Sequence, residues 1–275
     1  MNSDKNQINY VLTPADELGS LSVLVVSCDH YADIWPHFFY LFHKYWPDCP
    51  TQVFLGSNNL VYDNPGISNL LIGNDISWAD SAKQMVESLP TEYFLFLLED
   101  FFIRKPVDTK TLVSCLTALK HLDGGYLRLR PFPNPDHSLS GYPHIGMIDV
   151  GAPYRLALQA AIWRRDVFLN LVKPGESAWD MEIKGSRRSD NLTVGFYCSW
   201  EPIIKYHAAI TVGKWSPQGV KICEEEHMEI DYKKRSRLTP QAIRRLYFRR
   251  MINKMINVVP WKLRRKLRQF LNFQA

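Results

Sequence analysis

The chain has 275 residues, enough for one large domain with a substantial buried core. Its 46% hydrophobic and 13% aromatic residues exclude an intrinsically disordered protein. No apolar run approaches the roughly 18 residues that a membrane-spanning helix needs, and we expect no secretory signal because residues 1–9 are polar. The five cysteines are scattered without a C-x-x-C pair, so we expect reduced thiols in a cytoplasmic protein and no cysteine metal cage.

The net charge of +5 hides an uneven distribution along the chain. From Lys233 onward the sequence carries 14 of its 33 basic residues and no acidic residue. The preceding part therefore combines 19 basic with 28 acidic side chains, a net charge of −9. We predict an acidic globular domain over 1–232 and a basic tail over 233–275, each with its own role.

The first half of the chain alternates strand-like and helix-like segments. Runs of apolar and β-branched residues predict strands, at Leu21–Ser27, Thr51–Gly56, Leu70–Gly73 and Tyr93–Leu98. Helical spacing with capping residues or a following proline predicts helices, at Ile34–Trp46, Ser77–Leu89 and Asp108–His121. This alternation predicts the α/β class, a mostly parallel sheet flanked by helices.

The second half is less regular. We predict a strand over Tyr126–Arg130 and a proline-rich loop over Pro131–Pro143. A helix is expected over Leu156–Leu171, a short helix around Trp179–Ile183, and a strand over Ile203–Val212.

The most informative stretch is Tyr93–Phe102, Y-F-L-F-L-L-E-D-F-F. Its six apolar residues predict a strand buried on both faces, followed at once by Glu99 and Asp100. Ligands of open α/β sheets bind beyond the carboxyl ends of the strands. A carboxylate there is costly unless it meets a cation, a hydroxyl or a proton-transfer partner. A solvated acidic turn is the alternative.

Three segments, in this order, resemble the GT-A glycosyltransferases of bacterial surface-polysaccharide (lipopolysaccharide and capsule) biosynthesis. They are the strand end Ser27-Cys28-Asp29, the helix from Trp78 that leads into Leu98-Glu99-Asp100, and the segment Ser177–Ser186. The resemblance covers about 21–215. It implies a GT-A (Rossmann-like) sheet, a nucleotide-sugar donor and a saccharide acceptor.

The D-x-D motif of that family is shortened here, because Leu98 stands where the first Asp belongs. The resemblance implies that Asp100 binds a divalent cation, with His207 as a later ligand. Mg²⁺ or Mn²⁺ accepts one carboxylate together with diphosphate oxygens and water. His207 as an ordinary histidine is the alternative. A metal-free site is also open, with Lys214, Arg187 or Arg188 against the diphosphate.

The resemblance also assigns residues to the donor. The predicted nucleotide-sugar-binding residues are Ser27, Asp29, Asp75, Glu99, Asp100 and Lys214. Asp29 would contact the base or ribose, unless it caps the following helix. Arg128 and Arg130 are weaker candidates.

The reaction needs a base that takes the proton of the acceptor hydroxyl as that hydroxyl attacks the anomeric carbon. By resemblance we assign Glu182 to this role, with Asp180 second, and an exposed helix carboxylate as the alternative. Trp179 and Gln159 are predicted to bind the acceptor, although Trp179 also fits a core position. A base that acts directly implies inversion at the anomeric carbon.

The basic tail reads as two short amphipathic helices. Thr239-Pro240 is a helix start, and Pro260 restarts the pattern. Their apolar stripes comprise Ile243, Leu246, Tyr247, Met251, Met255 and Ile256, then Leu263, Leu267, Phe270 and Leu271. Basic helices of this kind predict attachment to an anionic membrane surface. Docking on the acidic domain is the second alternative, and nucleic-acid binding, which we do not expect, is the third.

We therefore predict a cytoplasmic glycosyltransferase, peripheral at the inner face of the cell membrane. It would transfer a sugar to a saccharide or lipid-linked saccharide. A sugar-phosphate nucleotidyltransferase and a catalytically degenerate GT-A domain that only binds glycan or a partner are the alternatives.

Overall fold

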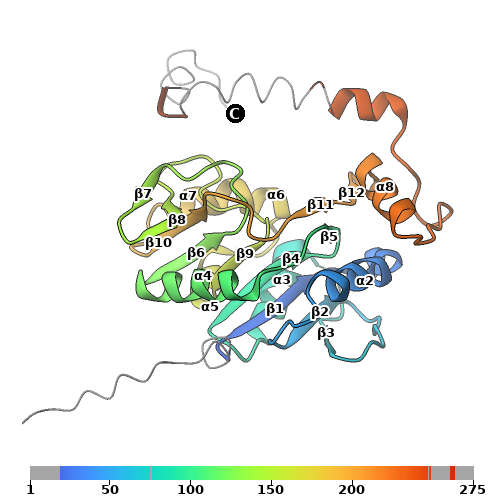
Figure 1. The fold of residues 1–275 in the computed structure, drawn as a ribbon, viewed down its shortest axis with the longest axis horizontal. Helices are drawn as coiled ribbons and strands as arrows, with labels where there is room; N and C mark the ends of the chain where they lie inside the picture. Colours follow the sequence, from blue (N-terminus) through green and yellow to red (C-terminus); the bar gives the residue numbers. More distant parts are fainter. Residues whose placement is uncertain (1–18, 75, 247, 249–260, 264–275) are drawn as a thin grey trace, which may run out of the picture.

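The structure is a computed structural model, and it describes residues 19–74, 76–246, 248 and 261–263. A nine-stranded sheet in the order β3-β2-β1-β4-β9-β6-β10-β8-β7 forms its centre (Figure 1). The strands are β1 Leu21–Val26, β2 Val53–Ser57, β3 Ile67–Leu71, β4 Tyr93–Leu98, β6 Gly124–Arg128, β7 His137–Leu139, β8 Tyr142–Met147, β9 Ala161–Arg164 and β10 Gly195–Ser199.

The strand directions make the sheet mostly parallel. β1 pairs in parallel with β2 and β4, β2 with β3, and β10 with β6. β9 runs antiparallel between β4 and β6, and β8 runs antiparallel to β10 and β7. Seven of the nine described strands therefore point one way, and the predicted α/β class is confirmed.

Helices cover both faces of the sheet. They are α2 Trp35–Tyr45, α3 Trp78–Glu87, α4 Thr109–His121 and α5 Arg165–Leu171. The short helix η1 Asp29–Ile34 leads into α2, and α8 Pro217–Glu225 packs beside β11 (Tyr206–Ala208), outside the central sheet. Alternate residues of β1 face opposite layers: Val23 packs with α2 and α4, and Leu24 packs with α3 and α5. Because both faces are buried, β1 and β4 read as continuous apolar runs.

Two of the three helix starts predicted in the first half, at Ser77 and Asp108, are confirmed by their caps. The Ser77 hydroxyl accepts a hydrogen bond from the backbone N–H of Asp80 at 3.1 Å. The Asp108 carboxylate accepts from the N–H groups of Lys110 and Thr111. Each cap satisfies N–H groups that the first turn of a helix leaves unpaired.

The helix predicted over Leu156–Leu171 is wrong in its first part. Residues Ala161–Arg164 form β9, and only Arg165–Leu171 are helical. Ile162 and Trp163 are fully buried between β4 and β6, so long-range pairing decides their conformation. A short apolar run does not distinguish a buried strand from a helix.

The loop predicted over Pro131–Pro143 is also wrong in part. β7 and the first residues of β8 fall within it and pair at the sheet edge. Gly141 takes a left-handed conformation (φ +81°) in the turn that joins them.

Two small two-stranded sheets lie outside the central sheet. β11 (Tyr206–Ala208) pairs with β5 (Phe101–Ile103), and β12 (Ile210–Thr211) pairs with β13 (Lys214–Trp215). The strand predicted over Ile203–Val212 is therefore present as β11 and β12. Trp215 then exchanges two backbone hydrogen bonds of 3.0 Å with residues 236 and 238.

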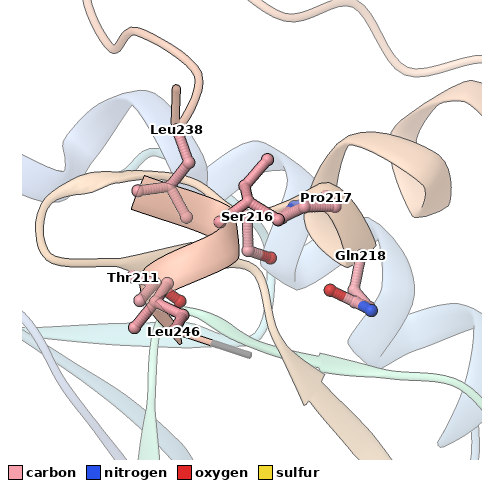
Figure 2. A pocket seen from close by; sticks show the side chains of 7 residues that line it. Thr211, Ser216, Pro217, Gln218, Leu238 and Leu246 are labelled. Atoms are coloured by element: carbon pink, nitrogen blue, oxygen red, sulfur yellow. The ribbon is translucent and has the colours of Figure 1, made fainter. Parts of the chain in front are cut away.

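The start of the predicted tail helix is confirmed at Thr239. Its hydroxyl accepts a hydrogen bond from the N–H of Ala242, and residues 240–246 are helical. Leu238 and Leu246 line a small pocket with Thr211 and Ser216 of the β12–β13 hairpin (Figure 2).

The other predicted tail residues, Tyr247, 249–260 and 264–275, lie outside the described residues. Within the described ranges, no helix is long and apolar enough to cross a membrane.

Candidate functional site

The carboxyl ends of β1, β2, β4 and β6 meet at one edge of the sheet, and the reversed strand β9 begins there. Side chains that follow these strands are brought together although they are far apart in sequence. This edge is where an open α/β sheet binds its ligands.

Glu99 follows β4 and is buried at this edge, with only 7% of its surface exposed. It is hydrogen-bonded to the Ser27 hydroxyl, which also accepts a 2.8 Å bond from the indole N–H of Trp35. Burial, and next to it the charge of Asp100, raise the pKa of Glu99 to about 8. The predicted neighbours Ser27 and Glu99 therefore do lie together.

Asp100 is the second carboxylate of this edge. Burial raises its pKa to about 7, against hydrogen bonding by the backbone of Ile210. Its backbone carbonyl accepts a 2.8 Å bond from the N–H of Ala209, which places the β12–β13 hairpin directly beside it. Within the described part of the chain, its buried Oδ1 has no hydrogen-bond partner. Leaving such an oxygen unpaired costs free energy that a proton or a cation would recover.

Arg235 is a buried residue near this edge that the sequence did not reveal. It falls in the predicted basic tail, yet it is only 4% exposed. It forms a two-point ion pair with Asp33, at 3.0 and 2.9 Å, and donates to the carbonyls of His30 and Gly213. Its guanidinium lies 4.4 Å from the ring centre of Tyr31. We call this set of contacts the Arg235 clasp.

The charge of Arg235 acts on both Glu99 and Asp100. It favours the charged forms of both carboxylates. Burial, and next to it the charges of Glu99 and Asp100, raise the pKa of Tyr31. Among the described residues, Arg235 thus acts on three acidic groups, Glu99, Asp100 and Asp33. Since the pKa of Glu99 is raised to about 8 and that of Asp100 to about 7, both groups hold protons near neutral pH that a bound cation would replace.

Asp29 joins the ends of β1 and β2. Its carboxylate accepts hydrogen bonds from the backbone N–H groups of Asn58, Asn59 and Leu60. Its own N–H donates to Asn58 Oδ1 at 3.0 Å. The carboxylate does not cap the following helix, η1, whose N-cap is Cys28. Asn58 Nδ2, by contrast, is buried without a partner among the described residues.

Tyr206 of β11 connects this cluster to the second candidate region. Its ring stacks on Phe101, the residue after Asp100, with 4.1 Å between ring centres. Its hydroxyl accepts a bond from the N–H of Ala160, just before β9. Arg130 lies 4.8 Å from the centre of the Tyr206 ring.

Glu182 lies in the second region, on a continuous helical segment made of α6 (Ala178–Asp180), η2 (Met181–Gly185) and α7 (Ser186–Ser189). Its Oε1 accepts a 2.8 Å bond from the N–H of Leu158. Burial raises its pKa, opposed by that bond and by the charge of Arg128. A half-buried carboxylate with a raised pKa suits a general base near neutral pH.

Asp180 has a different role on the same segment. Ser177 and Asp180 form a reciprocal capping box, and Asp180 also pairs with Lys184 at 2.8 Å. The bond to Lys184, followed by those to Ser177, lowers the pKa of Asp180 to about 2. Asp180 is therefore committed to the helix start, which favours Glu182 as the base.

Trp179 and Gln159 lie near Glu182. Trp179 is 62% exposed, which excludes the core alternative, and its ring meets that of Tyr154 edge to face at 6.4 Å. Gln159 is next to Leu158, and its Nε2 donates to the carbonyl of Phe132 at 2.6 Å.

The remaining predicted site residues are not joined to either cluster. His207 is exposed on β11, and its pKa is lowered by burial and by the cations Arg130 and Arg104. Lys214 is exposed on β13. No group of three His, Cys, Asp or Glu side chains that could hold a metal occurs in the described ranges. Asp75 lies outside the described residues.

Two other candidate arginines have structural partners. Arg188 bonds to Glu176, at 2.8 and 2.7 Å, and to the carbonyl of Leu171. Arg128 is fully buried and donates to the carbonyls of Tyr154 and Pro133. Neither guanidinium is available to a diphosphate without breaking these bonds.

The described part of the tail touches the domain. Trp261 Nε1 donates to Asp136 Oδ1 at 2.8 Å, and Lys262 pairs with Asp149 at 2.8 Å. Together with Leu238 and Leu246, these contacts agree with the docking alternative for this part of the tail. Membrane attachment and the boundary at 232/233 stay predictions.

Comparison with known proteins gives only distant structural similarity. No family model matches the chain, and no protein of curated function matches it. Among solved structures, residues 1–349 of S. aureus TarS in complex with UDP match at 12% identity, over 68% of this chain and 59% of that one, with a TM-score of 0.46. The chain thus spans about three fifths of that TarS fragment.

Two further structures match at similar distance. The 2-C-methyl-D-erythritol 4-phosphate cytidylyltransferase of Thermus thermophilus matches at 10% identity, over 75% of this chain and 97% of that one, with a TM-score of 0.45. The mannosyl-3-phosphoglycerate synthase of Rubrobacter xylanophilus matches at 12% identity, over 57% and 59%, with a TM-score of 0.34. Function therefore has to be argued from the side chains of this chain itself.

Proposed function

We propose that this protein is a glycosyltransferase that moves a sugar from a nucleotide-sugar donor to a saccharide acceptor in surface-glycan biosynthesis. The observation that carries the proposal is the buried Glu99 beside the half-buried Asp100 at the carboxyl edge of the sheet, where the buried Oδ1 of Asp100 has no partner among the described residues. A second, separate carboxylate, Glu182, stands near exposed aromatic rings. One acidic group for the donor and one for the acceptor is what the reaction requires.

On the donor side, Asp29 and Asn58 would hold the nucleoside at the ends of β1 and β2. Asp100 would hold a divalent cation, whose role is to neutralise the charge of the diphosphate as it leaves. Oxygen donors of this kind fit Mg²⁺ or Mn²⁺, which retain water and substrate oxygens as further ligands. His207 and Lys214 remain candidates for contacts to the diphosphate.

On the acceptor side, Glu182 would take the proton of the attacking hydroxyl. The new bond forms between that oxygen and the anomeric carbon, while the bond from that carbon to the diphosphate breaks and the nucleoside diphosphate departs. A direct attack of this kind inverts the anomeric carbon. Trp179 and Gln159 would position the acceptor.

The donor side is tested by thermal unfolding of the full chain with a panel of nucleotide sugars, UDP-GlcNAc among them, with and without Mn²⁺. A ligand that binds the folded state at a hundred times its Kd stabilises that state by about 2.7 kcal/mol, so a true donor raises the melting temperature. Asp100→Asn should abolish the Mn²⁺-dependent part of the shift. Asp123→Asn, which changes a carboxylate whose side chain is 86% exposed, is the matched control.

The same measurements separate the proposal from its rivals. A nucleotidyltransferase would release pyrophosphate from a nucleoside triphosphate and a sugar phosphate. A glycan-binding domain without activity would leave the nucleotide sugar intact. Slow hydrolysis of one nucleotide sugar, lost in Asp100→Asn, is the result expected here, and absence of any nucleotide-sugar shift contradicts the proposal.

We further propose that the tail attaches the enzyme to anionic membranes. The charge of residues 233–275 supports this, as do the exposed Arg244, Arg245 and Phe248. Flotation of the full chain with phosphatidylglycerol vesicles should exceed flotation with neutral vesicles, and Arg244→Glu with Arg245→Glu should reduce it. Equal flotation with anionic and neutral vesicles contradicts the attachment of the tail to anionic membranes.

A further inference from the structure

We infer that the tip of the β12–β13 hairpin, Val212 and Gly213, inserts into the interfacial layer of an anionic membrane. The inference rests on the proposed attachment of the tail to such membranes, and it adds a contact that belongs to the globular domain. It also gives the enzyme an orientation, because this hairpin lies beside Asp100.

The hairpin turn has an unusual sequence for its conformation. β12 (Ile210–Thr211) and β13 (Lys214–Trp215) leave only Val212 and Gly213 as the loop between them. Both residues have a positive φ, +50° for Val212 and +69° for Gly213. A two-residue hairpin loop of this kind is normally Asn-Gly or Asp-Gly, because these residues tolerate a left-handed backbone. A β-branched valine at such a position is an outlier and is strained.

The protein itself offers little to offset this strain. The side chain of Val212 is 85% exposed, a larger fraction than that of any other large apolar side chain in the described part of the chain. Isolated exposed apolar residues are common and need no explanation. An exposed valine that also strains its turn is unfavourable on two counts, and a partner outside the chain that takes up the side chain explains its presence.

The tip is fixed to the domain. Arg235 Nη1 donates to the Gly213 carbonyl at 2.9 Å, and the same guanidinium is bound to both carboxylate oxygens of Asp33. Trp215, the last residue of β13, exchanges two backbone hydrogen bonds with residues 236 and 238. Surroundings that impose a strained conformation in this way are typical of binding sites. The hairpin therefore presents Val212 on a rigid support.

The segment that fixes the tip is basic. Lys233 and Lys234 are exposed directly before Arg235, and no acidic residue follows them in the sequence. An apolar tip next to lysines fits the boundary between headgroups and acyl chains of an anionic bilayer. The valine would lie at the acyl boundary and the cations beside the anionic headgroups.

The tail helix reaches the same part of the surface. Thr211 of the hairpin and Leu246 of the tail helix line one small pocket (Figure 2). Arg244 and Arg245 are exposed on that helix, and Phe248 is 59% exposed. The hairpin tip and the tail helix thus combine exposed apolar side chains with cations in one region, and this is the chemistry that an anionic bilayer binds.

The position of the hairpin orients the candidate site. The N–H of Ala209, directly before β12, donates to the carbonyl of Asp100 at 2.8 Å. A hairpin tip in the headgroup layer therefore holds the donor edge of the sheet close to the bilayer. An acceptor carried on a membrane lipid reaches such a site without leaving the membrane, so the inference favours the lipid-linked form of the acceptor.

Flotation of the full chain with phosphatidylglycerol vesicles tests the inference. Val212→Asn removes the apolar tip and supplies a residue that the turn favours. It should weaken vesicle binding about fivefold, because a valine side chain no longer enters the acyl boundary. It should also raise the melting temperature by about 2 °C, because the strain is relieved. Unchanged flotation overturns the inference, and so does a melting temperature that does not rise, because the turn is then not strained.

Two further variants locate the effect. Val212→Leu keeps an apolar tip and should float at least as well as the wild type. Val61→Asn makes the same exchange at another valine, 62% exposed in the loop after β2, and should float like the wild type. If either variant loses as much flotation as Val212→Asn, binding does not depend on an apolar hairpin tip and the inference is overturned.

The tail variants distinguish this inference from the proposed function. We expect both Val212→Asn and the double variant Arg244→Glu with Arg245→Glu to reduce flotation. If only the double variant does, the tail attaches the protein and the hairpin inference fails. If only Val212→Asn does, the hairpin binds the membrane and the proposal for the tail fails. A wild type that does not float overturns both. The nucleotide-sugar shift in melting temperature tests the transferase proposal separately, and it should be the same in Val212→Asn as in the wild type.

Discussion

Glu99 and Glu182 belong to the two regions of the candidate site, and the chain holds them by different means. Glu99 is buried among β1, β4 and the Arg235 clasp, segments from both ends of the sequence. Glu182 stands on a helical segment that its own N-terminal cap fixes, and it accepts one further bond from Leu158, 24 residues earlier. The first region is built by tertiary contacts alone, and the second mainly by its local cap together with that one bond, so damage should spread through the first and stay more confined in the second.

The largest effect should follow from the locally built region. Glu182→Gln keeps the shape of the side chain and its bond from Leu158 but removes the base, so transfer should fall at least about a hundredfold. The nucleotide-sugar shift in melting temperature should stay unchanged, because the donor side is untouched. Initial rates with saturating donor measure this. Turnover near that of the wild type would remove Glu182 from the mechanism.

The next effect should come from the Arg235 clasp. Arg235→Met leaves the nearly buried Asp33 carboxylate without its cation, and breaking such a pair costs about 3 kcal/mol. Chemical denaturation should show this loss, and nucleotide-sugar binding should weaken with it because Tyr31 and the hairpin turn lose their anchor. Arg237→Ala, two residues away and exposed, is the control and should change stability little.

A smaller effect concerns the pH dependence of stability. In the folded protein the pKa of Glu99 is raised to about 8. The contribution of Glu99 to stability is therefore complete below the pKa that it has in the unfolded chain, and it is lost as the pH rises towards 8. With a chelator present, the free energy of unfolding of the wild type should therefore fall between pH 5 and 8, relative to Glu99→Gln, by about 2 kcal/mol or more. Glu92→Gln, at an exposed position, should track the wild type. Parallel curves of stability against pH for the wild type and Glu99→Gln contradict a buried Glu99 with a raised pKa.

The same contrast explains what the sequence could predict. β1 and β4 were predictable because strands buried on both faces are continuous apolar runs, and the carboxylates that follow β4 mark the sheet edge. β9 was not, because its four residues become a strand only between β4 and β6, which are distant in sequence.

Among the site residues, Glu182 and its cap were visible as a local pattern. Arg235 was not, because it stands in a run of cations, and only its pairing with Asp33, 202 residues earlier, sets it apart. The positive φ of Val212 was hidden too, since such a conformation leaves no mark in the sequence at a non-glycine residue.

The smallest effect should distinguish the two carboxylates of the helical segment itself. Asp180→Asn weakens the pair with Lys184 and the bonds with Ser177 that lower the pKa of Asp180 to about 2, so the helix start loosens slightly. Because Glu182 is also held by Leu158 from outside the helix, it should keep its place, and transfer should stay within about threefold of the wild type. Rates of Asp180→Asn and Glu182→Gln measured side by side give the contrast. If the transfer rate fell as far in Asp180→Asn as in Glu182→Gln, Asp180 would be the base. The bonds to Lys184 and Ser177 that lower its pKa would then have to be replaced when the acceptor binds.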